Sequence, residues 1–451
     1  MNSSEQPPAH LVVRAGRGIV RPQQGAANRV DPLFSTFDFA ALLFIMAAAI
    51  GVLNERTIDL PRPIALLIGA LLISGVLMML SSLLPYDLDH RARLRLSHAD
   101  LPKLLLDGIL ALLLFAASLH VDVVALRRRA VPIFVLASIG VFLATGLFGV
   151  GIYGVFAVAG VGVPLVWCLV LGAILAPTDA VAVDQLLKRV HMPGELRALI
   201  SGESLFNDGA AVVLFFALLA AASGDPHALG NGRIAIEFVV GGVGAAMLGL
   251  GAGYFGAFVL RKTKEPTLSV IISLALVFGT YRGAAWLDIS GPIAVVVAGL
   301  VFFHSGPAEN KATAHRAALK DFWAIADDLV NTLLFLFMGF EILAVPFLSG
   351  GWLPILAAVP LALIVRFLSV SPPVLLERAP PGGRWPAIGV LTWTGLRGGI
   401  SLALVLGLPE GPYRDALAAV CYAVVVFTVI VQGLTTPAVI RSLYRGDFRS
   451  P

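Results

Sequence analysis

Polar residues with the chemistry of a cation site stand inside two neighbouring apolar segments of this 451-residue chain. Asp179 follows Ala-Pro-Thr in one segment, and Asp208 ends a Glu-Ser-Leu-Phe-Asn-Asp stretch in the next. On a helix, Ser204 and Asp208 share one face because they are four residues apart, and Glu203 and Asn207 share the adjacent stripe for the same reason. Oxygen ligands of this kind suit hard cations.

A carboxylate in an apolar setting can also hold a proton, because burial disfavours its charged form. Asp179, Asp208, the Ser204 hydroxyl and carbonyls freed at Pro177–Thr178 can therefore surround a dehydrated alkali cation or exchange it for a proton. Glu203 needs a partner at the same depth, and Arg397 is the expected one. The alternative is that both aspartates are structural and paired with arginine. More acids than bases inside the apolar segments argue against it.

The composition excludes a soluble enzyme. Hydrophobic residues make up 58% of the chain and charged residues 13%, whereas a soluble domain carries about 25% charged residues. The net charge of +4 is assigned to cytoplasmic loops rich in Lys and Arg and not to nucleic-acid binding. Cys168 and Cys421 lie in apolar segments, so neither a disulfide framework nor a metal cluster is expected. The sequence predicts an all-α polytopic membrane protein.

A membrane span needs about 20 apolar residues, and thirteen candidate spans follow from the apolar runs. Their limits are 34–53, 61–84, 103–121, 130–159, 165–187, 196–222, 233–260, 267–287, 291–304, 322–343, 353–376, 385–408 and 415–440. The polar residues 1–32 form an expected flexible tail without a cleaved signal peptide, and residues 442–451 form a short C-terminal tail.

Two of these spans break helix rules. Pro177 and Asp179 interrupt the fifth span, and Gly395, Gly398 and Gly399 surround Arg397 in the twelfth. The two spans are seven apart and therefore cross the membrane in opposite directions. Interrupted helices at matching positions of inverted repeats are typical of transporter binding sites. The sequence thus predicts two inverted repeats with crossed interrupted helices.

Loop charges predict the orientation. Lys and Arg are more numerous after the odd-numbered spans and in the C-terminal tail, which favours a cytoplasmic C-terminus and an external N-terminus. The basic N-terminal tail and the loop at 85–102 argue the other way. Gly-rich stretches at 149–154 and 241–256 are interpreted as close helix packing, although the first fits GxGxxG.

Three further charged residues have weaker signals. Asp184 either lines a cytoplasmic funnel or pairs with Lys188. Glu341 and Arg366 are interpreted as structural or interfacial, and Arg366 has the length to snorkel toward the membrane surface.

Two other functions compete with transport. An intramembrane aspartyl protease would use Asp179 and Asp208 as its dyad. Such proteases resemble Tyr-Asp and Gly-x-Gly-Asp patterns, whereas this chain has Thr-Asp and Asn-Asp. A cation channel is the second alternative, but nothing here resembles a repeated carbonyl filter.

Three stretches resemble the monovalent cation:proton antiporter family, in its NhaP and sodium/proton-exchanger branch. They are Ala-Pro-Thr-Asp-Ala-Val-Ala at 176–182, Gly-Glu-Ser-Leu-Phe-Asn-Asp-Gly at 202–209 and Gly-Leu-Arg-Gly-Gly at 395–399. The resemblance covers about residues 35–440 and implies a secondary antiporter, not an enzyme. It implies exchange of Na⁺, with Li⁺ and K⁺ as alternatives, for H⁺ without a cofactor.

The resemblance also implies roles for the residues of these stretches. Asp208 and Asp179 would carry the ion and the proton by competition during alternating access, with Ser204 and the Thr178 carbonyl as further Na⁺ ligands. Three further residues would hold the site in place: Glu203, Asn207 and Arg397. The Asn-Asp pair is associated with electroneutral one-for-one exchange. Where several members carry a glutamate in the third span, this chain has Ala116, so no role of that glutamate is carried over.

At the level of domains, the resemblance implies an ion-carrying core and a dimerisation part. The core would comprise residues 130–222 and 353–440, and the dimerisation part residues 34–121 and 233–343. A homodimer in the lipid bilayer is therefore expected. The excess of Arg over Lys favours a GC-rich bacterium and hence its plasma (inner) membrane.

Overall fold

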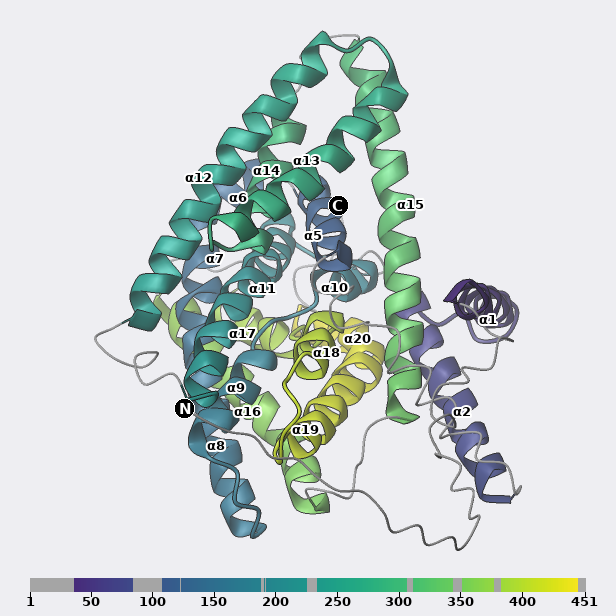
Figure 1. The fold of residues 1–451 in the computed structure, drawn as a ribbon, viewed down its shortest axis with the longest axis vertical. Helices are drawn as coiled ribbons and strands as arrows, with labels where there is room; N and C mark the ends of the chain where they lie inside the picture. The colour runs from purple at the N-terminus through teal and green to yellow at the C-terminus, as the bar shows by residue number, and fades with distance from the viewer. Residues whose placement is uncertain are drawn as a thin grey trace, which may run out of the picture. The chain divides into compact units, whose positions relative to one another are not determined.

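The computed structural model describes residues 36–83, 108–121, 123–187, 190, 192–224, 233–305, 311–343, 351–376 and 383–444. These residues form helices joined by short connections, and no strand occurs among them (Figure 1). The chain divides into two compact units, residues 1–42 and 43–451. Every contact described below lies within the second unit.

The helices of the first half are α1 (Thr36–Thr57), α2 (Arg62–Leu83), α5 (Leu110–His120), α6 (Val123–Arg128), α7 (Ala130–Ala137), α8 (Ile139–Val158), α9 (Leu165–Ile174), α10 (Ala180–Leu187) and α11 (Gly194–Ala222). Those of the second half are α12 (Arg233–Lys262), α13 (Pro266–Trp286), α14 (Gly291–His304), α15 (Lys311–Phe340), α16 (Trp352–Leu376), α17 (Arg384–Trp393), α18 (Gly399–Leu406), α19 (Arg414–Phe427) and α20 (Gly433–Leu443). A 3₁₀ turn, η2 (Glu341–Leu343), follows α15, and a π-helical turn, η3 (Thr428–Gln432), joins α19 to α20.

Each predicted span coincides with a helix or with consecutive helices. Seven helical stretches of the described residues are long and apolar enough to cross a membrane, and three shorter helices are also apolar. This confirms an all-helical, multi-pass membrane protein, while the count of thirteen crossings and the inverted repeats stay predictions. The predicted beginning of the tenth span at 322 is wrong as a helix boundary, because α15 begins at Lys311. Its first turns are rich in Ala and also contain Lys, Arg and Leu, residues that favour helix without making the segment apolar.

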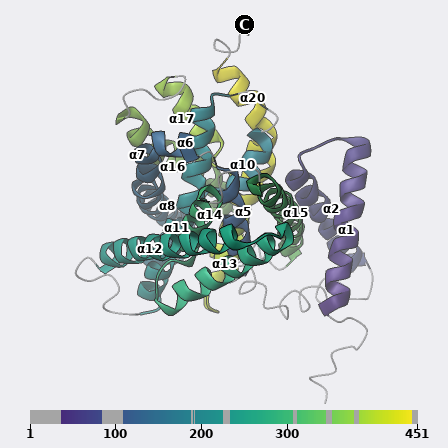
Figure 2. The ribbon, with the colours of Figure 1, turned by 90° about the horizontal axis from the view of Figure 1, so that it is seen from above.

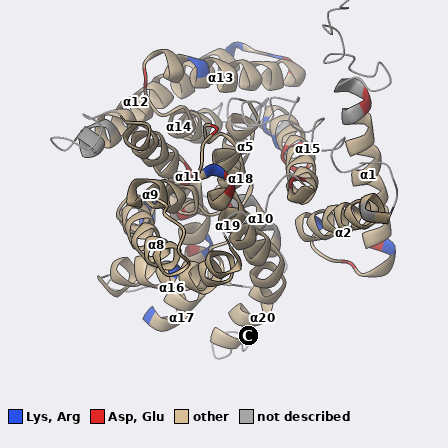
Figure 3. Ribbon diagram, turned by 60° about the horizontal axis from the view of Figure 1, so that its bottom comes forward, with Lys and Arg blue, Asp and Glu red and all other residues tan. Residues whose placement is uncertain are grey.

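The surface of the helices fits lipid better than water. Lys, Arg, Asp and Glu are sparse along the ribbon (Figure 3). Large apolar side chains such as Leu72, Met79, Met247 and Phe255 are each more than 60% exposed. An apolar surface of this extent marks contact with a membrane or a partner.

Small residues bring helices together, as the Gly-rich stretch 241–256 predicted. α12 packs against α14, and both lie beside α13 (Figure 2). A Cβ at Gly249 or Gly253 would overlap the α14 backbone at Ala294 or Ala298. Only glycine therefore permits this close helix approach.

Both predicted helix interruptions are confirmed. The first lies between α9 and α10, and the second lies between α17 and α18. The two interruptions touch, because the backbone N–H of Asp179 donates to the carbonyl of Leu396 over 2.8 Å. Irregular backbone at membrane depth is tolerated where protein satisfies its polar groups, and here each break satisfies part of the other.

Candidate functional site

Helix α11 carries four polar side chains in the middle of an apolar, buried stretch. Glu203, Ser204, Asn207 and Asp208 are each at most 3% exposed. The carboxylate atom Oδ1 of Asp208 has no hydrogen-bond partner among the described residues. An unpaired buried polar atom is costly, which marks Asp208 as the residue in this cluster that needs a ligand.

The first break is tied to α11 through Thr178. Its Oγ1 lies 2.8 Å from Ser204 Oγ and accepts a hydrogen bond from Asn207 Nδ2, also over 2.8 Å. The backbone N–H of Thr178 donates to Asn207 Oδ1 over 3.4 Å. The fifth and sixth spans therefore meet, as the expected cation site of Asp179 and Asp208 requires. The Ser204 hydroxyl, expected to face the cation, is engaged with Thr178.

Asp179 begins the second half of the broken helix. It precedes Ala180, the first residue of α10, and its Oδ1 accepts a hydrogen bond from the backbone N–H of Ala182 over 3.0 Å. This is the geometry of a helix N-cap. A Cβ at Gly398 would overlap the Asp179 carboxylate, so the second break lies directly against it.

Arg397 does not pair with Glu203, and that expectation is wrong. Its Nη1 donates to the carbonyls of Ala176 and Pro177, over 2.6 and 2.8 Å. The C-cap of α9 is Leu175, so both carbonyls lie in the break just beyond the helix. The negative end of the helix dipole also attracts a cation, so Arg397 fixes the first break at the C-terminal end of α9. The Pro177 carbonyl, expected to face the cation, is occupied, and the Thr178 carbonyl stays a predicted ligand.

Glu203 instead pairs with Arg366. Nη1 and Nη2 of Arg366 each donate to one Glu203 oxygen over 2.7 Å, and its Nε donates to the carbonyl of Leu391 over 3.1 Å. The Arg366 side chain is 8% exposed and that of Glu203 2%. Snorkelling by Arg366 is therefore wrong, because α16 turns this residue toward α11 and α17 and not toward lipid. The ion pair with Glu203 agrees with the expectation that Arg366 has a structural role.

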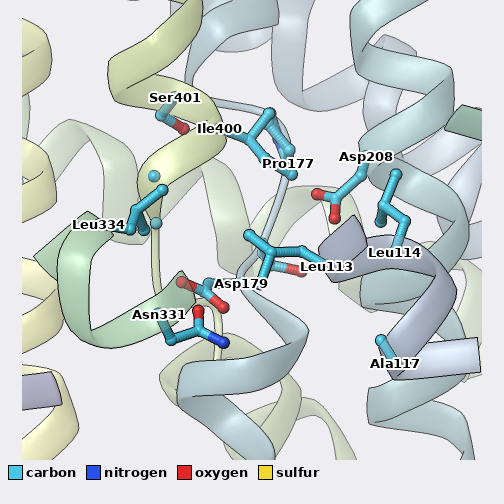
Figure 4. Close-up of a pocket in the computed structure, with 13 residues that line it drawn as sticks. Leu113, Leu114, Ala117, Pro177, Asp179, Asp208, Asn331, Leu334, Ile400 and Ser401 are labelled. Atoms are coloured by element: carbon cyan, nitrogen blue, oxygen red, sulfur yellow. The ribbon is translucent and has the colours of Figure 1, made fainter. Parts of the chain in front are cut away.

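A cavity connects the two aspartates. Figure 4 shows Asp208 and Asp179 reaching it from different elements, with Asn331 beside Asp179. Helix α5 contributes an apolar wall, and α15 and the start of α18 contribute polar groups. The lining residues are Leu113, Leu114, Ala117, Pro177, Thr178, Asp179, Asp208, Asn331, Leu334, Gly398, Gly399, Ile400 and Ser401. Two acids and no Lys or Arg are among them.

The family model described as "Sodium/hydrogen exchanger, transmembrane" matches residues 39–442. The chain belongs to this family. It is 37% identical over 419 residues to the Na⁺/H⁺ antiporter NhaP of Pseudomonas aeruginosa, which covers 91% of this chain and 97% of that protein. It is 32% identical to the Na⁺/H⁺ antiporter NhaH of Halobacillus dabanensis over 74% of this chain and 81% of that protein.

The fold matches a solved structure of the sodium proton antiporter MjNhaP1 from Methanocaldococcus jannaschii. The TM-score is 0.71 at 17% identity, with 90% of this exchanger and 98% of that chain covered. Membership makes this protein a secondary transporter and not an enzyme, which excludes the intramembrane protease. Exchangers of this family carry ions as cargo and use no cofactor.

Glu341 and Ala116 of this exchanger are not among the residues that line the cavity. Glu341 is buried in η2. Asp184 belongs to α10, but its side chain and the whole of Lys188 lie outside the described residues. Ala116 is buried with Phe115 and Trp323 in a second apolar cluster, so the α5 wall of the cavity carries no acid.

Asn331 and Ser401 line the cavity, and the sequence did not single them out as site residues. Asn331 Nδ2 donates to the carbonyl and to Oδ1 of Asp327, over 2.8 and 3.0 Å. Asn331 also lines a second cavity that includes the exposed residues Arg62 and Asp328. The available signals were weak: one amide in an apolar run, and one hydroxyl two residues after the Gly-Gly pair.

Proposed function

We propose that this exchanger moves Na⁺ across the membrane in exchange for H⁺, with the two ions competing for Asp208 and Asp179. The observation that carries the proposal is the Oδ1 atom of Asp208, which has no hydrogen-bond partner in the described part of the chain and lies in a cavity that Asp208 shares with Asp179. A buried carboxylate needs a counter-charge or a proton. A monovalent cation supplies the first and protonation the second.

The nearby basic residues strengthen this argument because their hydrogen bonds are directed elsewhere. Arg366 uses both terminal nitrogens on Glu203, and Arg397 uses Nη1 on the carbonyls of Ala176 and Pro177 in the first break. Neither arginine lines the cavity. An exchangeable ion is therefore the natural partner of the Asp208 carboxylate.

The position of the cavity supports alternating access. Asp179, Asp208 and Ser401 come from the predicted core, whereas Leu113 and Asn331 come from the predicted dimerisation part. A cavity between two such parts opens or closes when one moves against the other. We propose that residues 130–222 and 353–440 move as the core, against a dimerisation part formed by residues 34–121 and 233–343.

A separate apolar cluster supports the same division. It joins α5 with α12 to α15 through Phe115, Phe302 and Trp323, with ring centroids 6.2 and 4.9 Å from Phe115. All of its members fall in the predicted dimerisation part. We also propose a homodimer formed through this part. The bacterial relatives favour the inner membrane of a bacterium, and the loop charges favour a cytoplasmic C-terminus.

The test uses purified protein in liposomes with an acidic lumen and a pH-sensitive dye inside. Addition of external Na⁺ is expected to alkalinise the lumen with wild-type protein. Asp208→Asn and Asp179→Asn should abolish the response, while Asp288→Asn, on an exposed residue, should keep it. Equal concentrations of Li⁺ and K⁺ rank the cations. A silent wild type, or an active Asp208→Asn variant that is folded by size-exclusion chromatography, would overturn the proposal.

A further inference from the structure

Ser401 carries a buried hydroxyl that could still accept or donate a hydrogen bond or bind a cation. The residue lies in the first turn of α18, three positions after Gly398, and is 1% exposed. Its Oγ has no hydrogen-bond partner among the described residues. A buried polar atom without a hydrogen-bond partner lowers the free energy of unfolding, so we expect a ligand that binds the Ser401 hydroxyl.

Several buried serines of this exchanger satisfy their hydroxyls within their own helix. Ser118 Oγ donates to the carbonyl of Phe115 over 2.6 Å, and Ser369 Oγ donates to the carbonyl of Arg366 over 3.0 Å. Such back-bonding to the preceding turn is the ordinary arrangement for serine in a helix. Ser401 lacks a full preceding turn, because the chain is broken between Thr394 and Gly398. The break therefore leaves its hydroxyl available.

The Ser401 hydroxyl belongs to the same cavity as the exchangeable carboxylate. Ser401 and Asp208 line it together with Asp179. Of the buried atoms without a hydrogen-bond partner among the described residues, two belong to residues that line this cavity: Ser401 Oγ from α18 and Asp208 Oδ1 from α11. By contrast, Ser204 Oγ lies 2.8 Å from Thr178 Oγ1, and Ser204 is not among the lining residues.

We propose that Ser401 Oγ is a ligand of the transported cation, beside the carboxylates of Asp208 and Asp179. The assignment rests on the proposed exchange function and adds a neutral oxygen ligand, of the type hard cations prefer, from the second broken helix. A hydroxyl does not titrate near neutral pH. Ser401 therefore strengthens cation binding without changing the number of protons that the site takes up.

The test separates cation binding from folding. Ser401→Ala removes the oxygen. Ser401→Cys keeps a side chain of similar volume but replaces the oxygen with sulfur, a poor ligand for Na⁺. Both variants should raise the Na⁺ concentration that half-saturates exchange about five- to tenfold, as expected for the loss of one neutral ligand, while the maximal rate is kept. Ser371→Ala is the matched control, because its Oγ is satisfied by the carbonyl of Phe367 over 2.6 Å.

A second readout uses binding without transport. Stabilisation of the detergent-solubilised protein by Na⁺ should need correspondingly more Na⁺ in both Ser401 variants. Unchanged Na⁺ dependence in both assays would overturn the assignment, even if thermal stability without Na⁺ had fallen. The function itself is judged on the wild type, because an absent Na⁺ response there would overturn the exchange proposal and this assignment with it.

Discussion

Arg366 and Glu203 form a two-point ion pair, with both N–O distances 2.7 Å, although they are 163 residues apart in the chain. The pair joins α16 to α11 inside the protein. Asn207 Nδ2 donates to Glu203 Oε1 over 3.1 Å and to Thr178 Oγ1 over 2.8 Å. The ion pair is thus the far end of a polar chain that holds the first helix break beside Asp208.

The ion pair predicts strong coupling between Glu203 and Arg366. Removing one partner of a buried pair leaves an uncompensated charge and costs about 3–5 kcal/mol. Glu203→Ala and Arg366→Ala should each lower the melting temperature in detergent, and the double variant should recover part of the loss. A parallel cycle of Glu203→Ala with Arg397→Ala should be closer to additive. Additive losses in the first cycle would show that the pair does not act as a unit.

The sequence predicted the site's acids and breaks because both signals are local. A charge or a proline inside an apolar run is visible without knowledge of neighbouring helices. Hydropathy therefore placed Asp179 and Asp208 inside neighbouring apolar segments, and their chemistry indicated one shared cation site. The structure brings both to one cavity.

The hydrogen-bond partners of Arg366 and Arg397 could not be predicted from the positions of charges within apolar spans. Arg366 and Arg397 both lie inside apolar spans, and depth alone does not tell which of them faces Glu203. The choice depends on the rotation of α16 about its axis and on the carbonyls that the first break exposes. Ser401 was missed for a related reason. Its hydroxyl is available because Ser401 lies in the first turn of α18, directly after the break, and the residue type alone does not show this.

We predict that position 398 must be glycine because a larger side chain would collide with Asp179. The Gly398 φ of −125° is open to any residue, but a Cβ would overlap the Asp179 carboxylate. Overpacking of this kind costs about 1–3 kcal/mol. Gly398→Ala should therefore displace Asp179 and weaken Na⁺ exchange severalfold or more. Gly154→Ala in α8 is the control, because no atom lies within 4 Å of its Cβ position. Equal exchange by both variants would contradict the prediction.

Asn331 is predicted to affect the rate of ion access. It lines both the Asp179–Asp208 cavity and the cavity with Arg62 and Asp328. Asn331→Leu makes this shared wall apolar, which penalises a partly hydrated cation. The maximal exchange rate should fall while the half-saturating Na⁺ concentration stays near the wild-type value. The control is Thr145→Val, which alters a buried hydroxyl outside both cavities. A changed Na⁺ affinity at an unchanged rate would identify Asn331 as a ligand instead.

The last prediction is that exchange is electroneutral, one cation for one proton, and it follows from a count of buried charges. Glu203 cancels Arg366 within their ion pair. Arg397 and Asp179 add one positive and one negative charge at the two breaks, which meet where the Asp179 N–H donates to the Leu396 carbonyl. The prediction takes Asp179 as charged in both half-cycles, so that Asp208 alone changes its charge, because Asn207 holds no titratable proton and Ala116 supplies no third acid.

On that count, the proposed core has the same net charge with Na⁺ or with H⁺ on Asp208. A membrane potential acts with about 2.3 kcal/mol per charge per 100 mV, so it should leave the equilibrium of such a carrier unmoved. The measurement uses proteoliposomes in which K⁺ and valinomycin set the voltage at fixed Na⁺ and H⁺ gradients. The Na⁺ gradient at which lumenal pH stays constant should be independent of voltage. A shift of this reversal point would show net charge movement, and Asp179 would then have to take up a second proton in each cycle.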